Sequence, residues 1–300
     1  MESSDWQMVK KKKACRKSPR RKEPLGCAVD LLFPQLHISD PIQDLSKVTK
    51  RINETMESLK VSEFWNSFQN CLQQCPYILP VPSDECKENE HNKTTHKDER
   101  CTSRQNLDIV CYGLGNFSSC VISLHQLALL LLLLERLQIP KCQSYIFDPL
   151  FTVLEISVLQ KFGLTVVSEN EEGKYKVCRH TVFYMPHCGK ALYNNLLWRN
   201  WLQNSLSNII IIGNSFKGIE ERLLSRILQR DYVYIQMSLQ VVEEMAFPEY
   251  PEYNDIFNDT SIHWFPLEKL ETLPSKAWEL QNEPSYQGCE DVEIIQNKKR

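Results

Sequence analysis

The chain has 300 residues, of which 42% are hydrophobic and 24% are charged, and its formal net charge at pH 7 is −3. This length accommodates one or two domains with a sizeable core, although the mean hydropathy of −0.38 indicates that part of the chain is solvated tail or linker. A net charge this small excludes bulk electrostatic attraction to nucleic acid or membranes as the main activity, so we expect neither as a partner.

Residues 1–26 are polar and basic, and we expect them to form a disordered tail. No apolar segment follows the charged start, so we predict no secretory signal. Together with the twelve cysteines, this indicates reduced thiols and a cytoplasmic or nuclear protein. The basic clusters Lys10–Lys13 and Arg20–Lys22 resemble a bipartite nuclear localisation signal; a solvated tail and a loose RNA-binding arm are the alternatives.

Residues 40–76 form a predicted helical arm. Asp40 and Pro41 are a favourable helix start, because Asp can cap the helix and Pro is tolerated at its first position. Apolar residues then recur in steps of three and four, at Ile42, Leu45, Val48, Ile52, Met56 and Leu59. A second helix should carry the aromatic pair Phe64–Trp65 and end before Pro76. We expect the arm to pack on the main domain. The arm from Asp40 to Cys75 is also a candidate surface for a protein partner, and its aromatic pair would be the first residues to test.

Residues 82–106 contain no large apolar residue and are predicted to be a disordered linker. His91 and His96 lie in this linker, but nothing around them would hold a metal geometry, so no metal site is predicted. The dipeptide Cys75–Pro76 is of a kind that can ligate haem iron through the thiolate. The alternative is a helix that simply ends at a proline.

The main domain is predicted at residues 107–272, where short apolar strands alternate with helices. The predicted strands are 107–112, 144–148, 164–168, 181–185 and 208–214, and the predicted helices are 119–138, 151–162, 189–202 and 219–228. This order predicts an α/β fold with a mostly parallel sheet and helices on both faces. Two late strands, 232–237 and 261–266, could pair antiparallel at one edge. The outline is Rossmann-like and also suits the variant used by S-adenosylmethionine-dependent methyltransferases, and a loose polar tail should follow at 273–300.

The loop after the first strand, from Gly113 to Ser118, is a partial dinucleotide fingerprint. In an open parallel sheet, ligands bind beyond the carboxyl ends of the strands. The full fingerprint has a third glycine where this chain has Ser118, which could instead cap the next helix and help to bind an anion. Asp148 ends the second strand, where such folds bind ribose hydroxyls, but it could equally cap the next helix across Pro149. A tight strand-to-helix turn without a ligand is the alternative for the first loop.

The loop after the fourth strand has the most reactive composition, with His187 beside Cys188 and Lys190 shortly after them. His187 is a candidate general base or ligand of a metal or haem iron, and Cys188 near a helix start is a candidate nucleophile. A simple anion-facing turn at Gly189 is the alternative. The chain has no Walker loop, Gly-x-Ser-x-Gly or His-Glu-x-x-His motif, so no catalytic residue is assigned. The predicted ligand rim comprises Gly113, Gly115, Asn116, Ser118, Asp148, His187 and Gly189.

Seven stretches occur in order between Leu107 and Pro266: YGLGNFSSC, HQLALLLLLLE, FDPLFT, NEEGKY, FYMPHCGKALYNNLLWRNW, IIIIGNSF and FNDTSIHWFP. Together they resemble the sensitivity-to-red-light-reduced family, SRR-like for short. The resemblance implies a regulatory protein associated with the circadian clock, first through light signalling in plants. In animals it implies an association with clock-gene expression and with regulation of haem biosynthesis. It implies no established catalytic reaction and carries no agreed catalytic residue.

Two hypotheses follow from the residues and the resemblance. In the first, the protein is a non-catalytic regulator whose Rossmann-like domain binds a small molecule or a protein partner. In the second, it is a transferase that uses S-adenosylmethionine or a nucleotide at the strand-end loops, although Tyr112 stands where such enzymes often carry an acidic residue. The candidate cofactors are S-adenosylmethionine, a nucleotide and haem, and the residues alone do not choose among them.

Overall fold

The computed structural model describes residues 41–76, 78, 107–287, 289, 294 and 295. The basic tail and the linker, with the nuclear signal and the histidine pair that we predict in them, lie outside the described residues. All described residues belong to one unit of the chain, Ser39–Arg300.

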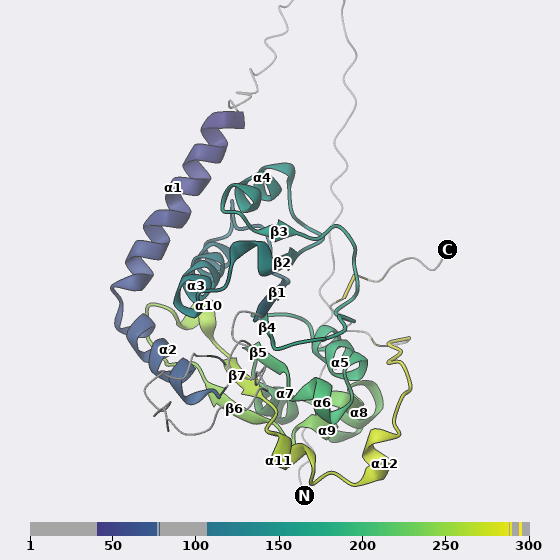
Figure 1. Ribbon diagram of the computed structural model, residues 1–300. Coiled ribbons are helices and arrows are strands. Elements are labelled where there is room, and N and C mark those ends of the chain that lie inside the picture. The colour runs from purple at the N-terminus through teal and green to yellow at the C-terminus, as the bar shows by residue number, and fades with distance from the viewer. Residues whose placement is uncertain (1–40, 77, 79–106, 288, 290–293, 296–300) are drawn as a thin grey trace, which may run out of the picture. The chain divides into compact units, whose positions relative to one another are not determined.

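In the described part of the chain, seven strands form one sheet with the order β3-β2-β1-β4-β5-β7-β6 (Figure 1). They are β1 (Asp108–Tyr112), β2 (Ser144–Phe147), β3 (Thr165–Val166), β4 (Thr181–Met185), β5 (Ile209–Asn214), β6 (Glu243–Ala246) and β7 (Thr260–Trp264). Strands β1 to β5 pair in parallel, whereas β7 runs antiparallel to both β5 and β6. The predicted α/β fold, with a mostly parallel sheet and antiparallel pairing near one edge, is confirmed.

The central strands are buried on both faces, which explains why they read as uninterrupted apolar runs. In β5, Ile210 and Ile212 belong to the hydrophobic core on one face of the sheet, and Ile209 and Ile211 belong to the core on the other face. The alternation follows from the period of two in a strand.

Helices cover both faces of this sheet (Figure 1). One core takes residues from α1 (Pro41–Lys60), α2 (Glu63–Gln74), α3 (Val121–Leu137), α4 (Val153–Lys161) and α10 (Asn254–Phe257). The other takes residues from α5 (Lys190–Arg199), α6 (Gln203–Leu206), α7 (Phe216–Arg222), α8 (Ser225–Asp231), α9 (Val233–Ser238), α11 (Leu267–Leu270) and α12 (Ser275–Trp278). A short 3-10 helix, η4 (Lys141–Gln143), leads into β2. None of the helices in the described ranges is long and apolar enough to cross a membrane.

The predicted helical arm is present as α1 and α2, and it contributes to the core of the first face. Val48 and Ile52 of α1 are buried, and α1 lies against α3. Phe64 is 1% exposed and stacks on Phe257 of α10, with 4.9 Å between ring centroids. Trp65 is buried as well. Both aromatic residues are therefore core residues and do not lie on an exposed surface. The use of the arm as a partner surface stays a prediction.

The strand predicted at residues 232–237 is also wrong, because this segment runs from α8 into α9. Its residue types favour a strand, but Oδ1 of Asn194 in α5 accepts hydrogen bonds from the backbone N–H groups of Tyr234 (3.0 Å) and Ile235 (3.3 Å). This side chain caps the first turn of α9, so a tertiary contact overrides the local preference. Conversely, β6 has no counterpart among the predicted strands, because its sequence Glu-Glu-Met-Ala is charged and only partly buried.

The tail predicted to be loose after residue 272 packs onto the second face as far as Tyr286. This side chain is buried in the core that α5 and α9 share. Its hydroxyl donates to Asn195 Oδ1 at 2.8 Å and accepts from Asn194 Nδ2 at 3.1 Å. Trp278 of the same tail packs on Trp201, with 5.6 Å between ring centroids. The polar composition of the tail conceals these two aromatic anchors, and the prediction of a loose tail is wrong up to Tyr286.

Candidate functional site

The carboxyl ends of β1, β2, β4 and β5 meet at one edge of the sheet, because these strands are parallel. Ligands bind at this edge in open α/β sheets. The predicted rim residues come from three of the loops there: Gly113, Gly115, Asn116 and Ser118 follow β1, Asp148 follows β2, and His187 and Gly189 follow β4. The structure joins the β1 loop to the β2 loop by hydrogen bonds and to the β4 loop by packing.

Gly113 marks the point where the β1 and β4 loops touch. Its φ is +67°, and a Cβ atom at this position would lie 2.5 Å from Cys188 Sγ. The Cys188 thiol is buried and donates to the backbone oxygen of Tyr112 at 3.2 Å. The glycine is therefore required for close packing of two loops.

The Asp148 carboxylate is bound by the chain itself. Its Oδ2 accepts from the Gly115 N–H at 2.7 Å, and its Oδ1 accepts from the Leu150 N–H at 2.8 Å. The second contact closes a local turn across Pro149. The alternative that Asp148 caps the next helix is wrong, because the N-cap of α4 is Thr152. Because Asp148 is only 9% exposed, a ribose would have to compete with both backbone donors.

Glu155, in the first turn of α4, is the residue around which the β1 loop is organised, and it is not among the predicted rim residues. It is fully buried. Its Oε1 accepts from the N–H (3.0 Å) and hydroxyl (2.9 Å) of Ser118. Its Oε2 accepts from Asn116 Nδ2 at 3.0 Å and from the Thr152 N–H at 2.9 Å. Burial raises the pKa of this carboxyl, but the hydrogen bonds from Thr152, Ser118 and Asn116 outweigh it, so the pKa lies below its usual value.

The Glu155 carboxylate therefore occupies the position in the β1 loop where a bound anion would lie. The prediction that Ser118 caps the next helix is wrong, because the N-cap of α3 is Cys120. The Ser118 N–H donates to Glu155 instead, and the Ser118 backbone oxygen accepts from Arg51 of α1 at 2.7 Å. A phosphate on the same donors would meet the carboxylates of Asp148 and Glu155 at unfavourable Coulomb energy. The sequence signal for Glu155 was the capping box with Thr152, in which each side chain bonds the other's backbone.

His187 joins the β4 loop to the turn before β7. It has a positive φ of +57°. Its Nδ1 accepts from Gln126 Nε2 at 3.3 Å, and its Nε2 donates to the backbone oxygen of Asn258 at 3.3 Å, a tautomer assigned from these partners. Since the Cys188 thiol faces β1 instead, the two neighbours do not form a catalytic pair. Gly189 begins α5 with an ordinary negative φ.

Cys75, the other haem candidate, lies in the core at the end of α2. It is 2% exposed, and burial raises the pKa of its thiol to about 12. Haem ligation through cysteine requires an accessible thiolate, so the structure supports the alternative of a helix that ends at a proline. Among the residues that the structure describes, no group of three or more His, Cys, Asp and Glu side chains could hold a metal ion.

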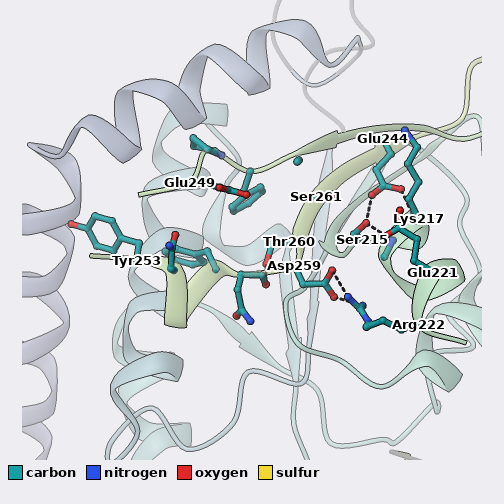
Figure 2. A pocket seen from close by; sticks show the side chains of 17 residues that line it. Ser215, Lys217, Glu221, Arg222, Glu244, Glu249, Tyr253, Asp259, Thr260 and Ser261 are labelled. Carbon is teal, nitrogen blue, oxygen red and sulfur yellow. Dashed lines mark hydrogen bonds and ion pairs between the residues drawn. The ribbon is translucent and has the colours of Figure 1, made fainter. Parts of the chain in front are cut away.

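A cavity of about 570 Å³ lies beside the predicted rim, beyond the ends of β5 and β6 and the start of β7. We call it the β5–β7 cavity. Figure 2 shows Tyr253 and Glu249 on one side of it and Lys217, Glu221 and Arg222 on the other. The sequence does not predict this cavity, because its lining comes from α7, the segment between β6 and α10, and the turn before β7, which have no common motif.

One wall of the β5–β7 cavity is a network of fixed polar groups. Asp259 accepts from two nitrogens of the Arg222 guanidinium, at 3.0 and 2.5 Å. The Asp259 backbone oxygen accepts from the Ser215 N–H at 2.8 Å. The Ser215 hydroxyl donates to Glu244, whose Oε2 also accepts from the Lys217 N–H at 3.1 Å. The start of α7 is thus held by the side chain of Glu244 from β6 and by the backbone oxygen of Asp259, whereas the Asp259 carboxylate binds the last residue of the helix, Arg222.

His263 lies under this wall and is completely buried. Its Nδ1 donates to the backbone oxygen of Ile211 at 3.2 Å, and its Nε2 accepts from the Phe216 N–H at 3.4 Å. Burial lowers the pKa of His263 to about 4, although the nearby Glu244 opposes this shift. His263 is therefore neutral at physiological pH and supplies no positive charge to Glu244.

Comparisons of the sequence with known proteins match the chain to one family. The SRR1 domain profile matches residues 72–264. The SRR1-like protein of Mus musculus is 45% identical over 205 residues, which cover 66% of this chain and 82% of that protein. The SRR1-like protein of Drosophila melanogaster is 33% identical over 162 residues, or 54% of this chain and 56% of that protein. The protein SENSITIVITY TO RED LIGHT REDUCED 1 of Arabidopsis thaliana is 26% identical over 274 residues, or 87% of this chain and 90% of that protein. The matched range 72–264 contains every strand of the sheet, the predicted rim and the β5–β7 cavity.

Proposed function

Because the chain belongs to the SRR1 domain family, we propose that it is a regulatory protein that acts in circadian clock gene expression and in the regulation of haem biosynthesis. The name of the Arabidopsis relative, which refers to sensitivity to red light, supports a role in a pathway that responds to light. The proposal assigns the protein to the cytoplasm, with the nucleus as a second location.

The proposed mode of action is binding of a small ligand or a protein partner, without catalysis. One observation carries this proposal: the N–H groups of Gly115 and Ser118, which would hold a phosphate in a dinucleotide site, donate to Asp148 and Glu155. A loop satisfied in this way can support a binding surface, but it offers few free donors to a nucleotide. The adjacent β5–β7 cavity offers room for a ligand at the same edge of the sheet.

Cells from which the chain has been deleted test the regulatory proposal. We expect a changed amplitude or period of a clock-gene reporter and a changed haem content, and re-expression of the wild-type chain should restore both. A Glu155→Gln variant, which disturbs the β1 loop, should restore them poorly. Glu57→Gln, a change of the same kind on the exposed side of α1, should restore them fully. Unaltered reporter rhythm and haem content in the deleted cells would contradict the proposal.

A transferase that uses S-adenosylmethionine or a nucleotide is the second candidate. Two observations favour it: an antiparallel β7 lies between β5 and β6, an arrangement that suits methyltransferases of this type, and Asp148 ends β2. Calorimetric titration of the full chain separates the candidates. Binding of S-adenosylmethionine at micromolar concentration, lost in Asp148→Asn, would favour the transferase, and no binding at millimolar concentration would favour the regulator.

A further inference from the structure

The β5–β7 cavity has the size and the position of a small-molecule site. Its volume of about 570 Å³ lies within the range of about 300–1,000 Å³ that is usual for ligand pockets. It opens beyond the carboxyl ends of β5 and β6, the edge at which open α/β sheets bind ligands. The network that fixes the β1 loop does not use the residues that line this cavity.

Glu244 brings a buried negative charge to the wall of the cavity. Its side chain is 4% exposed, and it accepts hydrogen bonds from the Ser215 hydroxyl and the Lys217 N–H. His263 Nε2 lies 3.6 Å away, but this atom accepts the Phe216 N–H, so the ring is neutral. No lysine or arginine among the described residues forms an ion pair with Glu244. A buried carboxylate without a cationic partner favours a ligand that supplies one.

Ser261 adds a hydroxyl that no protein group uses. It lines the cavity and is 1% exposed. Its neighbours in register are Gly213 of β5 and Ala246 of β6, whose side chains are absent or too short to cover it. Within the ranges that the structure describes, its hydroxyl makes no hydrogen bond. Ser261 lies at the wall of the cavity, so a ligand there can form a hydrogen bond with its hydroxyl.

The remaining lining is negative on balance and partly aromatic. It contains four carboxylates and two cations: Glu221, Glu244, Glu249 and Asp259, with Lys217 and Arg222. The aromatic side chains are Phe247, Tyr253 and Phe257. Since Arg222 is already paired with Asp259, the unpaired charge in the cavity is mainly negative. Aromatic faces attract organic cations, so both parts of the lining select the same kind of ligand.

We propose that the β5–β7 cavity binds a small organic cation, with its ammonium or guanidinium group near Glu244 and Ser261 and its apolar body against Tyr253 and Phe257. This inference rests on the proposed function, because it names the class of ligand through which a regulatory domain of this family would act. A nucleotide or another anion would meet the net negative lining, and a neutral ligand would leave Glu244 without a counter-charge.

Three probes of matched shape test the proposal on the full chain: phenylpropylamine, phenylpropanol and phenylpropanoate, each titrated by calorimetry. We expect the amine to bind about tenfold more tightly than the alcohol, and the carboxylate to bind least. In Glu244→Gln, the affinity for the amine should fall to that for the alcohol. Glu243→Gln is the matched control, because Glu243 lies on the same strand but pairs with Lys269 at 2.6 Å and does not line the cavity. This control should keep the preference for the amine.

Thermal unfolding identifies a Glu244 variant that does not fold, and Glu249→Gln, an exposed change at the mouth of the cavity, then takes its place. We expect this variant to reduce the preference for the amine about threefold. Equal affinity for the amine and the alcohol, tighter binding of the carboxylate, or no binding of any probe at millimolar concentration would each overturn the cation site. The regulatory proposal is tested separately by the reporter rhythm and haem content of the deleted cells, so the two can fail independently.

Discussion

The carboxylate of Glu155 accepts hydrogen bonds from both the backbone N–H and the hydroxyl of Ser118, at 3.0 and 2.9 Å. The backbone oxygen of the same serine accepts from Arg51 at 2.7 Å. Ser118 therefore links three parts of the chain that are far apart in sequence: the loop after β1, helix α4 and helix α1. A loop held in this way does not need a bound phosphate to order it.

Replacement of Glu155 by glutamine should destabilise the fold. The amide presents two N–H donors where the carboxylate accepted bonds from Ser118, Asn116 and Thr152, so at least one buried donor loses its partner. We expect a loss of about 2–3 kcal/mol in the free energy of unfolding, measured by urea denaturation. Glu57→Gln on α1, which is exposed, should change it by less than about 0.5 kcal/mol. Equal stability of the two variants would show that Glu155 does not hold the loop.

An alanine at Gly113 should be costly for two separate reasons. Its φ of +67° strains any side chain, and the new Cβ would lie 2.5 Å from Cys188 Sγ. We expect a destabilisation of about 3 kcal/mol from strain and overpacking together. Gly163→Ala shares the positive φ but has no neighbour closer than 3.5 Å, so it should cost only about 1 kcal/mol. Thermal melts compare the two, and Gly113→Ala combined with Cys188→Ala should recover part of the difference.

Truncation of Phe64 should show that α2 is part of the core. Its ring lies 4.9 Å from that of Phe257 and 5.1 Å from that of Tyr253. Phe64→Ala should reduce the free energy of unfolding by about 3–5 kcal/mol. Val61→Ala, two residues before α2 and 82% exposed, serves as the control and should be nearly neutral. A Phe64→Ala variant as stable as the wild type would show that Phe64 is not part of the core.

Stability should fall as the pH falls from about 6.5 to about 4, and His263 should contribute to the fall. Its pKa in the folded protein is about 4, because burial disfavours the charged ring. In the unfolded chain the ring has its ordinary pKa of about 6.5, so between these values the unfolded state takes up a proton that the folded state does not. The neutral His263 ring contributes at most about 3 kcal/mol to the free energy of unfolding, and this contribution is fully present above about pH 6.5.

Urea denaturation at several pH values measures this effect. In His263→Gln the amide can still donate to Ile211 and accept from Phe216 but cannot titrate. The decrease in stability between neutral pH and pH about 4 should therefore be smaller in the variant than in the wild type. An identical pH dependence in both proteins would show that His263 is not the group responsible.

The sequence predicts the central strands of the sheet well, because each strand is marked by a continuous run of apolar residues. The apolar runs at β1, β4 and β5 are buried on both faces, and each lies where a predicted strand lies. The failures occur where partners distant in sequence decide the structure. Residues 232–237 have the composition of a strand, but the side chain of Asn194 caps them as a helix. Tyr286 lies in a polar tail, and the partners of its buried hydroxyl, Asn194 and Asn195, are about 90 residues away in the sequence.

In the candidate site, too, the sequence predicts the local features and misses those that depend on partners distant in sequence. The sequence locates the strand-end loops, because glycines and polar residues follow each apolar run, and it correctly leaves open that Gly113 and Asp148 have structural roles. It does not show that Glu155 fills the β1 loop, since a capping box alone does not say what else the carboxylate accepts. It also does not reveal the β5–β7 cavity, whose lining comes from segments that only the antiparallel placement of β7 brings together.

Calorimetric titration of the full chain with NAD and S-adenosylmethionine tests most directly whether the β1 loop is held by the protein's own carboxylates in place of a nucleotide. We predict no heat of binding for either compound at millimolar concentration, because the N–H groups of Gly115 and Ser118 already donate to Asp148 and Glu155. A dissociation constant in the micromolar range for either compound, weakened by Asp148→Asn, would contradict this and would favour the transferase.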